Sequence, residues 1–160
     1  NINHHCAIRI PFTIDGVQFA VTNIHFNWRA SDIRLDQLQF VNEWIASQTD
    51  DATIEFLGGD FNDCPGSPLH HAALREWVDL ADSFATRTGQ VAAATLDPVT
   101  NPHLASNDGV TTPVRYDWLL CQRSPLPVRL QHVQLIGNKR LTHHPLPSDH
   151  YGVLAHLTIH

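Results

Sequence analysis

The stretch Gly58-Gly59-Asp60-Phe61-Asn62-Asp63 follows a short apolar run, residues 53–57, and the interpretation of the chain starts from it. The run predicts a buried strand, and two glycines at its end let the backbone turn tightly and approach a ligand closely. Asp60 and Asn62 lie two positions apart, so both side chains can point into one cleft while Phe61 turns into the core. A carboxylate can hold a divalent cation or a water, and an amide can donate to a phosphate oxygen. A plain turn is the alternative interpretation of this stretch alone.

The composition is that of an ordinary globular domain of 160 residues, long enough to bury a core. No apolar run has the length that a membrane-spanning helix needs, so we expect no transmembrane segment. The formal net charge of −6 argues against tight, sequence-independent binding of nucleic acid. A nuclease stays open, because metal ions can supply local positive charge.

Cysteine and histidine give no zinc signature. The three cysteines are Cys6, Cys64 and Cys121, and without a Cys-x-x-Cys pair we expect free thiols, with one disulfide as the alternative. The 12 histidines include the doublets His4-His5, His70-His71 and His143-His144. Neighbouring side chains diverge on a helix or strand, so we interpret most of these histidines as surface residues. A zinc hydrolase would need a helical His-x-x-x-His pair, which no doublet provides.

Periodicity predicts a mixture of strands and helices. The predicted strands cover residues 7–14, 17–24, 53–57, 115–121, 127–136 and 151–159, and the predicted helices cover residues 32–48 and 68–76. Asp15-Gly16 predicts a hairpin turn. We expect Leu35 on the inner face of the first helix and Trp77 on that of the second. Residues 85–114 lack a period and predict a long loop, and the mixture predicts an α/β or α+β layered domain.

Three further polar sites lie at or near the predicted strand ends. His25 follows the strand over residues 17–24, Asp117 lies inside an apolar strand, and Asp149-His150 precedes the last strand. A buried Asp is expensive unless it is paired, and a His is a natural partner because a carboxylate fixes the tautomer of the imidazole. For each site taken alone, a satisfied core polar group or a surface residue is the alternative.

Four segments together resemble the endonuclease/exonuclease/phosphatase superfamily, which includes pancreatic-type DNase, AP endonucleases, inositol polyphosphate phosphatases and neutral sphingomyelinases. They are Thr22-Asn23-Ile24-His25, Gly59-Asp60-Phe61-Asn62, Arg115-Tyr116-Asp117-Trp118 and Ser148-Asp149-His150. Their order and spacing are similar to the C-terminal half of that family. The resemblance implies the C-terminal half of a four-layer α/β/β/α sandwich, with a mixed, mostly antiparallel sheet and outer helices.

The resemblance also implies a role for each residue in metal-assisted, in-line attack of water on a phosphoester, with Mg²⁺ or Mn²⁺ as the cation. Asp60 would orient or activate the water and contact the metal, and Asn62 would hold that water or a phosphate oxygen. Asp149 would ligate or orient toward the metal, and Asp117 would orient His150. His25 would donate to the phosphate, and His150 would act as general base or as phosphate donor, a choice the resemblance leaves open.

One departure from the family pattern concerns the metal. The family's N-terminal half carries an Asn and then a Glu that is the principal metal ligand, whereas residues 1–24 contain no Glu and the chain contains no Met. We therefore expect residues 1–160 to form a single domain that lacks the N-terminal half. We also expect the inner sheet face to pair with a second body, either another copy or the missing half, and the chain alone to have weak activity.

The substrate class stays open at this point. Residues 74–80, Asn101-Pro102 and Pro145-Leu146-Pro147 resemble loose features of the sphingomyelinase branch, and the acidic balance favours a lipid or small phosphodiester over polyanionic DNA. A nuclease of the same superfamily is one alternative. A non-catalytic interaction module that kept the fold is another.

Overall fold

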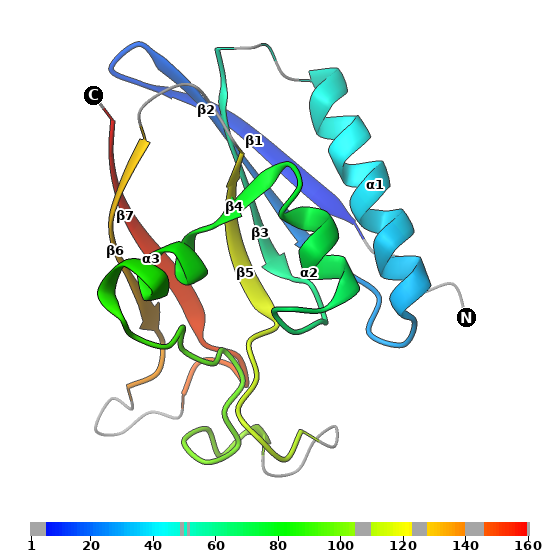
Figure 1. The fold of residues 1–160 in the computed structure, drawn as a ribbon, viewed down its shortest axis with the longest axis vertical. Helices are drawn as coiled ribbons and strands as arrows, with labels where there is room; N and C mark the ends of the chain where they lie inside the picture. Colours follow the sequence, from blue (N-terminus) through cyan, green and yellow to red (C-terminus); the bar gives the residue numbers. More distant parts are fainter. Residues whose placement is uncertain are drawn as a thin grey trace.

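The structure, a computed structural model, describes residues 6–48, 50, 52–104, 110–122, 128–139 and 146–159. A five-stranded sheet has the order β1-β2-β3-β5-β4, and β6 and β7 form a separate two-stranded sheet (Figure 1). The strands are β1 (Ala7–Ile14), β2 (Val17–His25), β3 (Ile54–Asp60), β4 (Trp77–Asp79), β5 (Asp117–Gln122), β6 (Val128–Ile136) and β7 (Gly152–Ile159). The helices are α1 (Ser31–Gln48), α2 (Pro68–Ala73) and α3 (Leu80–Thr88). Only β2 and β3 pair in parallel among these strands, so the α/β fold with a mixed, mostly antiparallel sheet is confirmed.

The connections around β2 determine which strand ends meet. Asp15 and Gly16 have φ values of 49° and 80°, which a two-residue hairpin turn between β1 and β2 requires. Helix α1 then crosses over the sheet, as a parallel connection must. The C-terminal ends of β2 and β3 therefore lie side by side, with His25 opposite Asp60 in the register.

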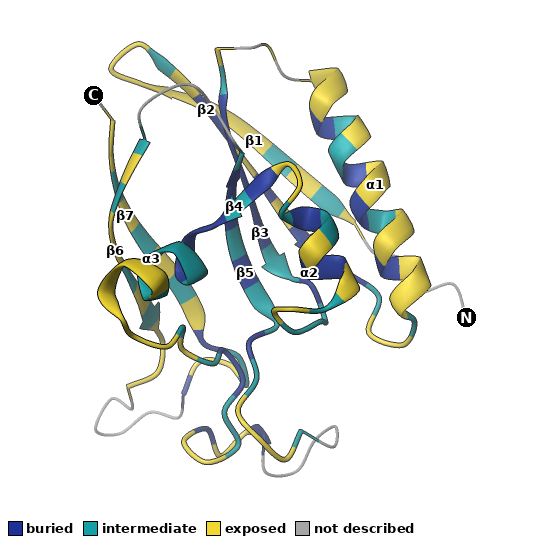
Figure 2. Ribbon diagram, viewed as in Figure 1, coloured by how far each residue is buried: buried dark blue, intermediate teal, exposed yellow. Residues whose placement is uncertain are grey.

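Helices α1 and α2 cover one face of the five-stranded sheet (Figure 1). Leu38, Val41 and Ile45 form the buried stripe of α1, which is dark blue in Figure 2 while the outer side of the helix is mostly exposed. In the same core Phe61 stacks on Trp118, with ring centroids 4.3 Å apart. Phe61 is fully buried, as the sequence predicts, and it ties the stretch after β3 to the core.

The β6–β7 hairpin covers part of the opposite face. Phe19, Ile54 and Phe56 of the large sheet are buried against apolar residues of the hairpin such as Leu130 and Leu157. Helix α3 flanks the hairpin, and Arg87 donates to the carbonyls of Leu130 and Gln131. The described elements thus form three layers: helices, the large sheet and the hairpin.

The rest of that inner face is open to solvent. Ile8, Ile10 and Ile14 of β1 point away from the helices and are 56%, 61% and 55% exposed. Figure 2 shows β1 as mostly exposed. The expectation of an open inner face therefore applies to β1, whereas the hairpin covers the central strands.

Two predicted boundaries around the second helix are wrong. Helix α2 ends at Ala73, and Trp77 lies in the short strand β4. Helix α3 occupies the start of the predicted loop over residues 85–114. Its capping signals are in the sequence: Asp79 accepts from the N–H groups of the first turn, and Gly89, with φ of 71°, ends the helix.

The inner face of α1 also differs from its prediction. Leu35 is 36% exposed, and the neighbouring Arg34 is buried instead. Asp63 makes this possible, because its Oδ2 accepts hydrogen bonds from Arg34 Nε and Nη2 at 3.2 and 3.0 Å. No helix in the described ranges is long and apolar enough to cross a membrane.

Gly59 generates the first prediction. Its φ is +130°, and a Cβ there would lie 2.0 Å from the carbonyl oxygen of Ile24 on the neighbouring strand. We expect Gly59→Ala to lower the free energy of unfolding by about 3 kcal/mol or more, measured by urea denaturation, because it combines backbone strain with a backbone clash.

Gly66→Ala is the matched control. Gly66 also has a positive φ, +83°, but a Cβ there meets nothing within 4 Å. This variant should lose about 1–2 kcal/mol, the cost of the left-handed conformation alone. Equal losses in the two variants would contradict the clash at Gly59.

Candidate active site

The predicted site residues meet where the central strands of the large sheet end. His25 ends β2, Asp60 ends β3 and Asp117 begins β5, and the register places these three residues next to one another across adjacent strands. The segment that carries His150 leads into β7 at the same end of the molecule, the lower end in Figure 1. Strand order thus brings together residues from four separate parts of the chain.

Asp117 and His150 form a hydrogen-bonded pair, as the sequence predicts. His150 Nδ1 lies 2.8 Å from Asp117 Oδ2. A carboxylate only accepts, so Nδ1 carries the proton and, in the neutral ring, Nε2 keeps its lone pair. Nε2 makes no hydrogen bond to the described residues. The bond to Asp117 raises the pKa of His150, against burial, which lowers it.

Asp60 lies between two histidines and a second carboxylate. Its Oδ1 accepts from the Asn62 N–H at 2.8 Å, and its Oδ2 lies 3.5 Å from His25 Nε2. Burial raises the pKa of Asp60 and the charge of Asp117 adds to this, while the Asn62 hydrogen bond and the two histidines oppose it. The net direction is upward, which makes Asp60 a stronger base than an ordinary carboxylate.

Asn62 is held in a conformation that few residues adopt. Its φ is +52°, in the left-handed region that Asn tolerates better than most side chains. Its Nδ2 donates to the carbonyl of Phe26 at 3.0 Å. This bond uses one of two N–H groups, so a second donor is left for a ligand.

These residues line one cleft with a volume of about 420 Å³. Its lining residues are His25, Trp28, Asp60, Asn62, Leu96, Leu104, Val110, Tyr116, Asp149 and His150. Five of the six predicted site residues are among them, and Asp117 contacts His150. The structure therefore brings the predicted set together, and the role of each member stays a prediction.

Trp28 and Tyr116 are cleft residues that the sequence did not single out. Trp28 is 58% exposed, and the guanidinium of Arg29 lies 4.5 Å from its ring centroid. Burial raises the pKa of Tyr116, so its phenol stays neutral at physiological pH. Trp28 follows the first recognised segment, three residues after His25, and Tyr116 lies within the third, directly before Asp117. These positions are the only sequence signal for them.

The two predicted metal ligands, Asp60 and Asp149, line the same cleft. Mg²⁺ usually takes one or two protein carboxylates and keeps several waters or substrate oxygens, and the cleft volume leaves room for them. A cation beside Asp60 would also offset the repulsion from Asp117. The residues present fit a divalent cation with few protein ligands.

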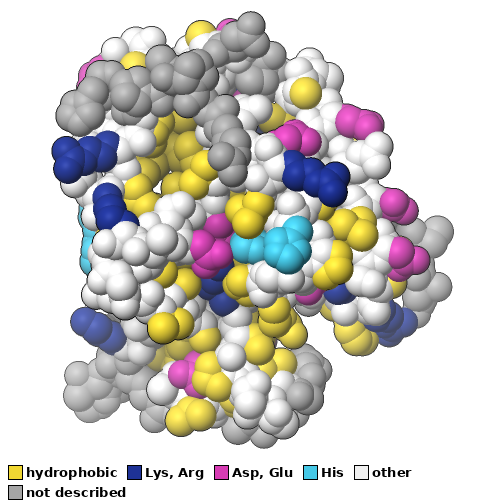
Figure 3. Space-filling view, in the orientation of Figure 1, with side chains coloured by type: hydrophobic (Ala, Val, Ile, Leu, Met, Phe, Trp, Pro, Cys, Tyr) yellow, Lys and Arg dark blue, Asp and Glu magenta, His cyan; other side chains and the backbone are white. Residues whose placement is uncertain are grey.

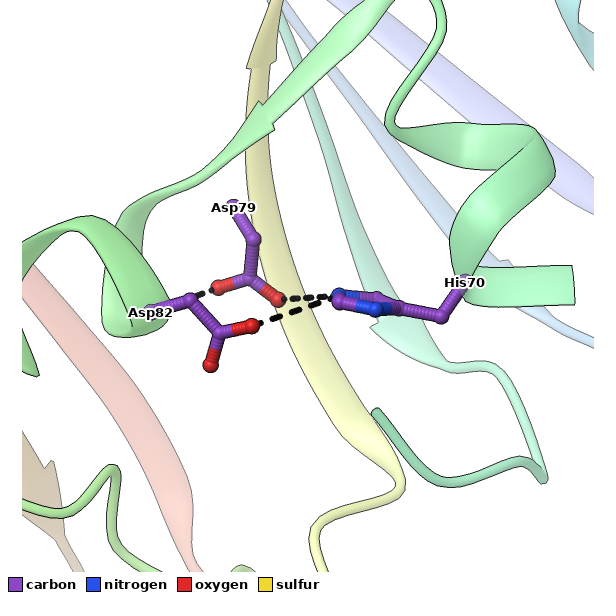
Figure 4. A group of neighbouring side chains, drawn as sticks. All are labelled: His70, Asp79 and Asp82. Atoms are coloured by element: carbon purple, nitrogen blue, oxygen red, sulfur yellow. Dashed lines mark hydrogen bonds and ion pairs between the residues drawn. The ribbon is translucent and has the colours of Figure 1, made fainter. Parts of the chain in front are cut away.

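A second cluster consists of His70, Asp79 and Asp82 (Figure 4). It has the residue types of a metal site, but its side chains already bind one another and Arg115. It is the only group of three His, Cys or carboxylate ligands within 4.8 Å of one another among the described residues. Arg115 donates to Asp79 at 2.9 Å and to Asp82 at 2.6 Å, so the carboxylates already face a cation. The Gly66 N–H donates to His70 Nδ1, which leaves Nε2–H to donate to Asp79. With no lone pair free on the ring, this is an ion-pair network that joins α2, β4, α3 and the segment just before β5.

His70 is an exception to the prediction that most of the histidines are surface residues. It is 3% exposed and packs edge-on against Trp118, whereas its neighbour His71 is exposed. The reason is that Asp79 and Gly66 satisfy both ring nitrogens. The doublets His4-His5 and His143-His144 lie outside the described residues.

The chain shares its fold with solved structures that include a protein named as an endonuclease/exonuclease/phosphatase family protein from Bacteroides thetaiotaomicron, with a TM-score of 0.65 and 16% sequence identity over 89% of this chain and 51% of that chain. The family resemblance predicted from the four segments is confirmed at the level of the fold.

Two other solved structures are similar to this chain. TDP2 from D. rerio, solved with a single-strand DNA product, has a TM-score of 0.73 and 19% identity over 95% of this chain and 61% of its own. The mannosyl-6-phosphatase from Bacteroides thetaiotaomicron has a TM-score of 0.67 and 16% identity over 90% of this chain and 52% of its own. No protein-family model matches the sequence, and no curated protein matches it. The chain spans only about half to three-fifths of the length of these structures.

The buried network generates a pH prediction. Burial alone would raise the pKa of Asp79, but His70 and Arg115 outweigh it and hold the pKa below its usual value. A depressed carboxyl pKa stabilises the folded state above the unfolded pKa of about 4, and this contribution is lost as pH falls through the folded pKa. Asp79→Asn should lower the free energy of unfolding by about 3–5 kcal/mol at pH 7, because it leaves buried Arg115 without its main partner.

Urea denaturation at pH 7 and pH 3 measures this effect. The difference between Asp79→Asn and the unmodified chain should shrink at pH 3, because this pH lies below the unfolded pKa of about 4 and the unfolded state then binds a proton at Asp79 that the folded state resists. Asp82→Asn is the control from the same cluster, because the Asp82 side chain is 40% exposed and should contribute less than about 1 kcal/mol. A gap for Asp79→Asn that is the same at both pH values would contradict the depressed pKa.

Proposed function

We propose that the chain carries the catalytic centre of a metal-dependent hydrolase of phosphoester bonds. The observation that carries the proposal is the convergence of Asp60, Asn62, His25 and His150 on one cleft, with His150 held by Asp117. The shared fold supports it, because solved structures of this fold include a phosphatase and a protein bound to a DNA product. We further propose that residues 1–160 form one domain.

In this proposal Asp60 orients the attacking water and accepts its proton. Before a cation binds, burial raises the pKa of Asp60, so this carboxylate accepts a proton more readily than an exposed one. Its Oδ1 is engaged by the Asn62 N–H, so Oδ2 is the atom that faces the water. His25 lies 3.5 Å from that oxygen and can contact the same phosphate.

His150 acts in this proposal as a donor to the phosphate. Asp117 holds its Nδ1–H, and the raised pKa favours the imidazolium, whose Nε2–H points a positive donor at the developing charge. The second N–H of Asn62 Nδ2 provides a neutral donor. Donors held rigidly before the reaction stabilise the transition state without reorganisation.

Asp60 and Asp149 would hold Mg²⁺ or Mn²⁺ in this site. The bound cation would polarise a phosphoryl oxygen and neutralise charge on the substrate. Ser148 Oγ lies 3.1 Å from Asp149 Oδ1 and helps to orient that carboxylate.

The surroundings of the cleft favour a lipid or other small phosphodiester as substrate. An apolar groove of about 270 Å³, lined by residues such as Phe26, Ile33 and Phe40, shares His25 with the cleft. Exposed Trp28 stands at the cleft as well. On the face shown in Figure 3, the coloured Lys and Arg side chains are scattered and do not gather into a basic patch. A substrate with an apolar substituent suits this arrangement better than a long polyanion does.

Two alternatives make different predictions. A nuclease of the same superfamily would cleave DNA or RNA with the same residues and show strong salt dependence. A non-catalytic interaction module would bind a partner and hydrolyse nothing. Its weakness is that the Asp117–His150 pair and the raised pKa of Asp60 suit proton transfer and are unneeded for docking.

The third prediction tests the function. Asp60→Ala and His150→Ala should each reduce hydrolysis of bis(p-nitrophenyl) phosphate with Mg²⁺ by about 10²–10⁴-fold, because each removes a proton-transfer or donor group. The fold should be retained, as checked by circular dichroism. His71→Ala is the control, because His71 is an exposed histidine away from the cleft lining.

Metal removal completes this test. EDTA should abolish hydrolysis, and Mg²⁺ or Mn²⁺ should restore it. Hydrolysis that persists in EDTA, or in the Asp60→Ala variant, would contradict the proposed mechanism. A chain that binds phosphodiesters and never hydrolyses them, alone or with its partner, would favour the interaction module.

We also propose that a second body covers the open inner face of β1. The candidates are another copy of the chain, joined by a two-fold interface, or the N-terminal half that the family resemblance implies. Ile8, Ile10, Phe12 and Ile14 form a row on that face, and an apolar row of this size is rarely left exposed in a monomer. The missing metal ligand would come from the same second body.

The fourth prediction tests this surface. Sedimentation of the purified chain at micromolar concentration should show self-association, and Ile10→Lys should weaken it by placing a charge in the apolar row. Val91→Lys is the control, because Val91 is 93% exposed on a loop outside the row. A stable, non-aggregating monomer of the unmodified chain would contradict the proposal.

A further inference from the structure

Two buried polar residues outside the proposed catalytic set form hydrogen bonds with the backbone beside Asp117 and His150. Thr95 and Asn101 are both fully buried, in the segment between α3 and β5. This segment pairs with the residues just before β5 through the isolated Leu96–Val114 bridge. Burying a hydroxyl and an amide is unfavourable unless each makes its hydrogen bonds, so their partners indicate what they do.

Thr95 contacts the chain on both sides of the Asp117–His150 pair. Its Oγ1 accepts from the N–H groups of Tyr116 and Asp117 at 3.2 and 3.1 Å. Its carbonyl accepts from the N–H of Tyr151, next to His150, at 2.8 Å. One residue therefore sets the separation between the backbone of Asp117 and that of His150.

Asn101 holds the other side of the His150 segment. Its Nδ2 donates both hydrogens, to the carbonyls of Ser148 and Asp149, at 3.0 and 2.9 Å. Its Oδ1 accepts from the N–H of His103 at 3.1 Å, so the amide has a partner for each N–H and for its oxygen. Within the described part of the chain, the other side-chain hydrogen bonds of Ser148 and Asp149 run only between neighbouring residues, so they cannot fix the position of this segment relative to the sheet.

We propose that Thr95 and Asn101 are positioning residues that hold His150 against Asp117 and so select the Nδ1–H tautomer of His150. Both act through backbone groups of the catalytic segments and neither takes part in the chemistry. The catalytic consequence rests on the proposed function, whereas the effect on the His150 ring does not. A displacement of about 1 Å can cost about 100-fold in rate, which is the scale of loss expected if this support is removed.

Isosteric variants separate positioning from packing. Thr95→Val keeps the shape and removes the acceptor, and Asn101→Asp keeps the shape and replaces two donors by an acceptor that faces two carbonyls. Thr95→Ser keeps the hydroxyl and is the conservative rescue variant. Long-range ¹H–¹⁵N correlation spectra of the full chain, at alkaline pH where the ring is neutral, report the tautomer, and His150→Gln assigns the signal.

The unmodified chain and Thr95→Ser should show the Nδ1–H tautomer of His150. Thr95→Val and Asn101→Asp should shift His150 toward the Nε2–H form that free histidine prefers, while circular dichroism shows the fold retained. Retention of the Nδ1–H form in both folded variants would overturn the inference. Failure of both variants to fold would also overturn it, because the residues would then support the fold as a whole.

An activity assay on the same variants separates this inference from the proposed function. Thr95→Val and Asn101→Asp should lower kcat for bis(p-nitrophenyl) phosphate about 100-fold with little change in KM. If the tautomer shifts as expected but the unmodified chain hydrolyses no phosphodiester, alone or with the second body, the positioning role stands and the proposed function fails. If activity is present and the tautomer does not shift, the proposed function stands and the positioning role fails.

Discussion

The site depends on how closely β2 and β3 approach at their C-terminal ends. At Gly59 the backbone of β3 lies so near the carbonyl of Ile24 that no side chain fits between them. This contact extends the parallel pairing to the last residue of each strand, where His25 lies opposite Asp60. A side chain at this position would push the strands apart just where the two catalytic candidates must meet.

The sequence predicted the elements whose signal is local. Alternation identified most strands, Asp15-Gly16 identified the hairpin, and four short segments in order predicted both the fold and the residues that line the cleft. Strand β4 was missed because three residues are too few to show a period. Trp28 and Tyr116 were missed because a position at the cleft follows from tertiary structure and from no pattern of spacing.

Burial of polar residues was the hardest property to predict. Arg34 is inside and Leu35 outside only because Asp63, far along the chain, neutralises the guanidinium. His70 is inside because Gly66 and Asp79 satisfy its two ring nitrogens. The spacing of apolar residues carries no information about such hydrogen-bond partners, so it could not predict that these two polar side chains are buried.

Two His–Asp pairs in the same chain show how surroundings decide chemistry. In the His70–Asp79 pair both ring nitrogens form hydrogen bonds and Arg115 neutralises the carboxylate, so the pair has a structural role. In the His150–Asp117 pair the described residues engage only one ring nitrogen, and His150 lines an open cleft. The pairing bond uses Nε2 in His70 and Nδ1 in His150, and only the His150 ring is accessible to a ligand.

The division of the strands into two sheets has a consequence for local opening. Among the described residues, the β6–β7 hairpin forms no backbone ladder with the large sheet and contacts the rest of the domain through side-chain packing and a few hydrogen bonds. Units attached in this way can open with a lower free energy than the whole domain. Because His150 leads directly into β7, such an opening would carry its imidazole away from Asp117 and leave the large sheet folded. The site can therefore lose and regain the Asp117–His150 hydrogen bond without global unfolding, at a rate set by how strongly the β6–β7 hairpin packs on the large sheet.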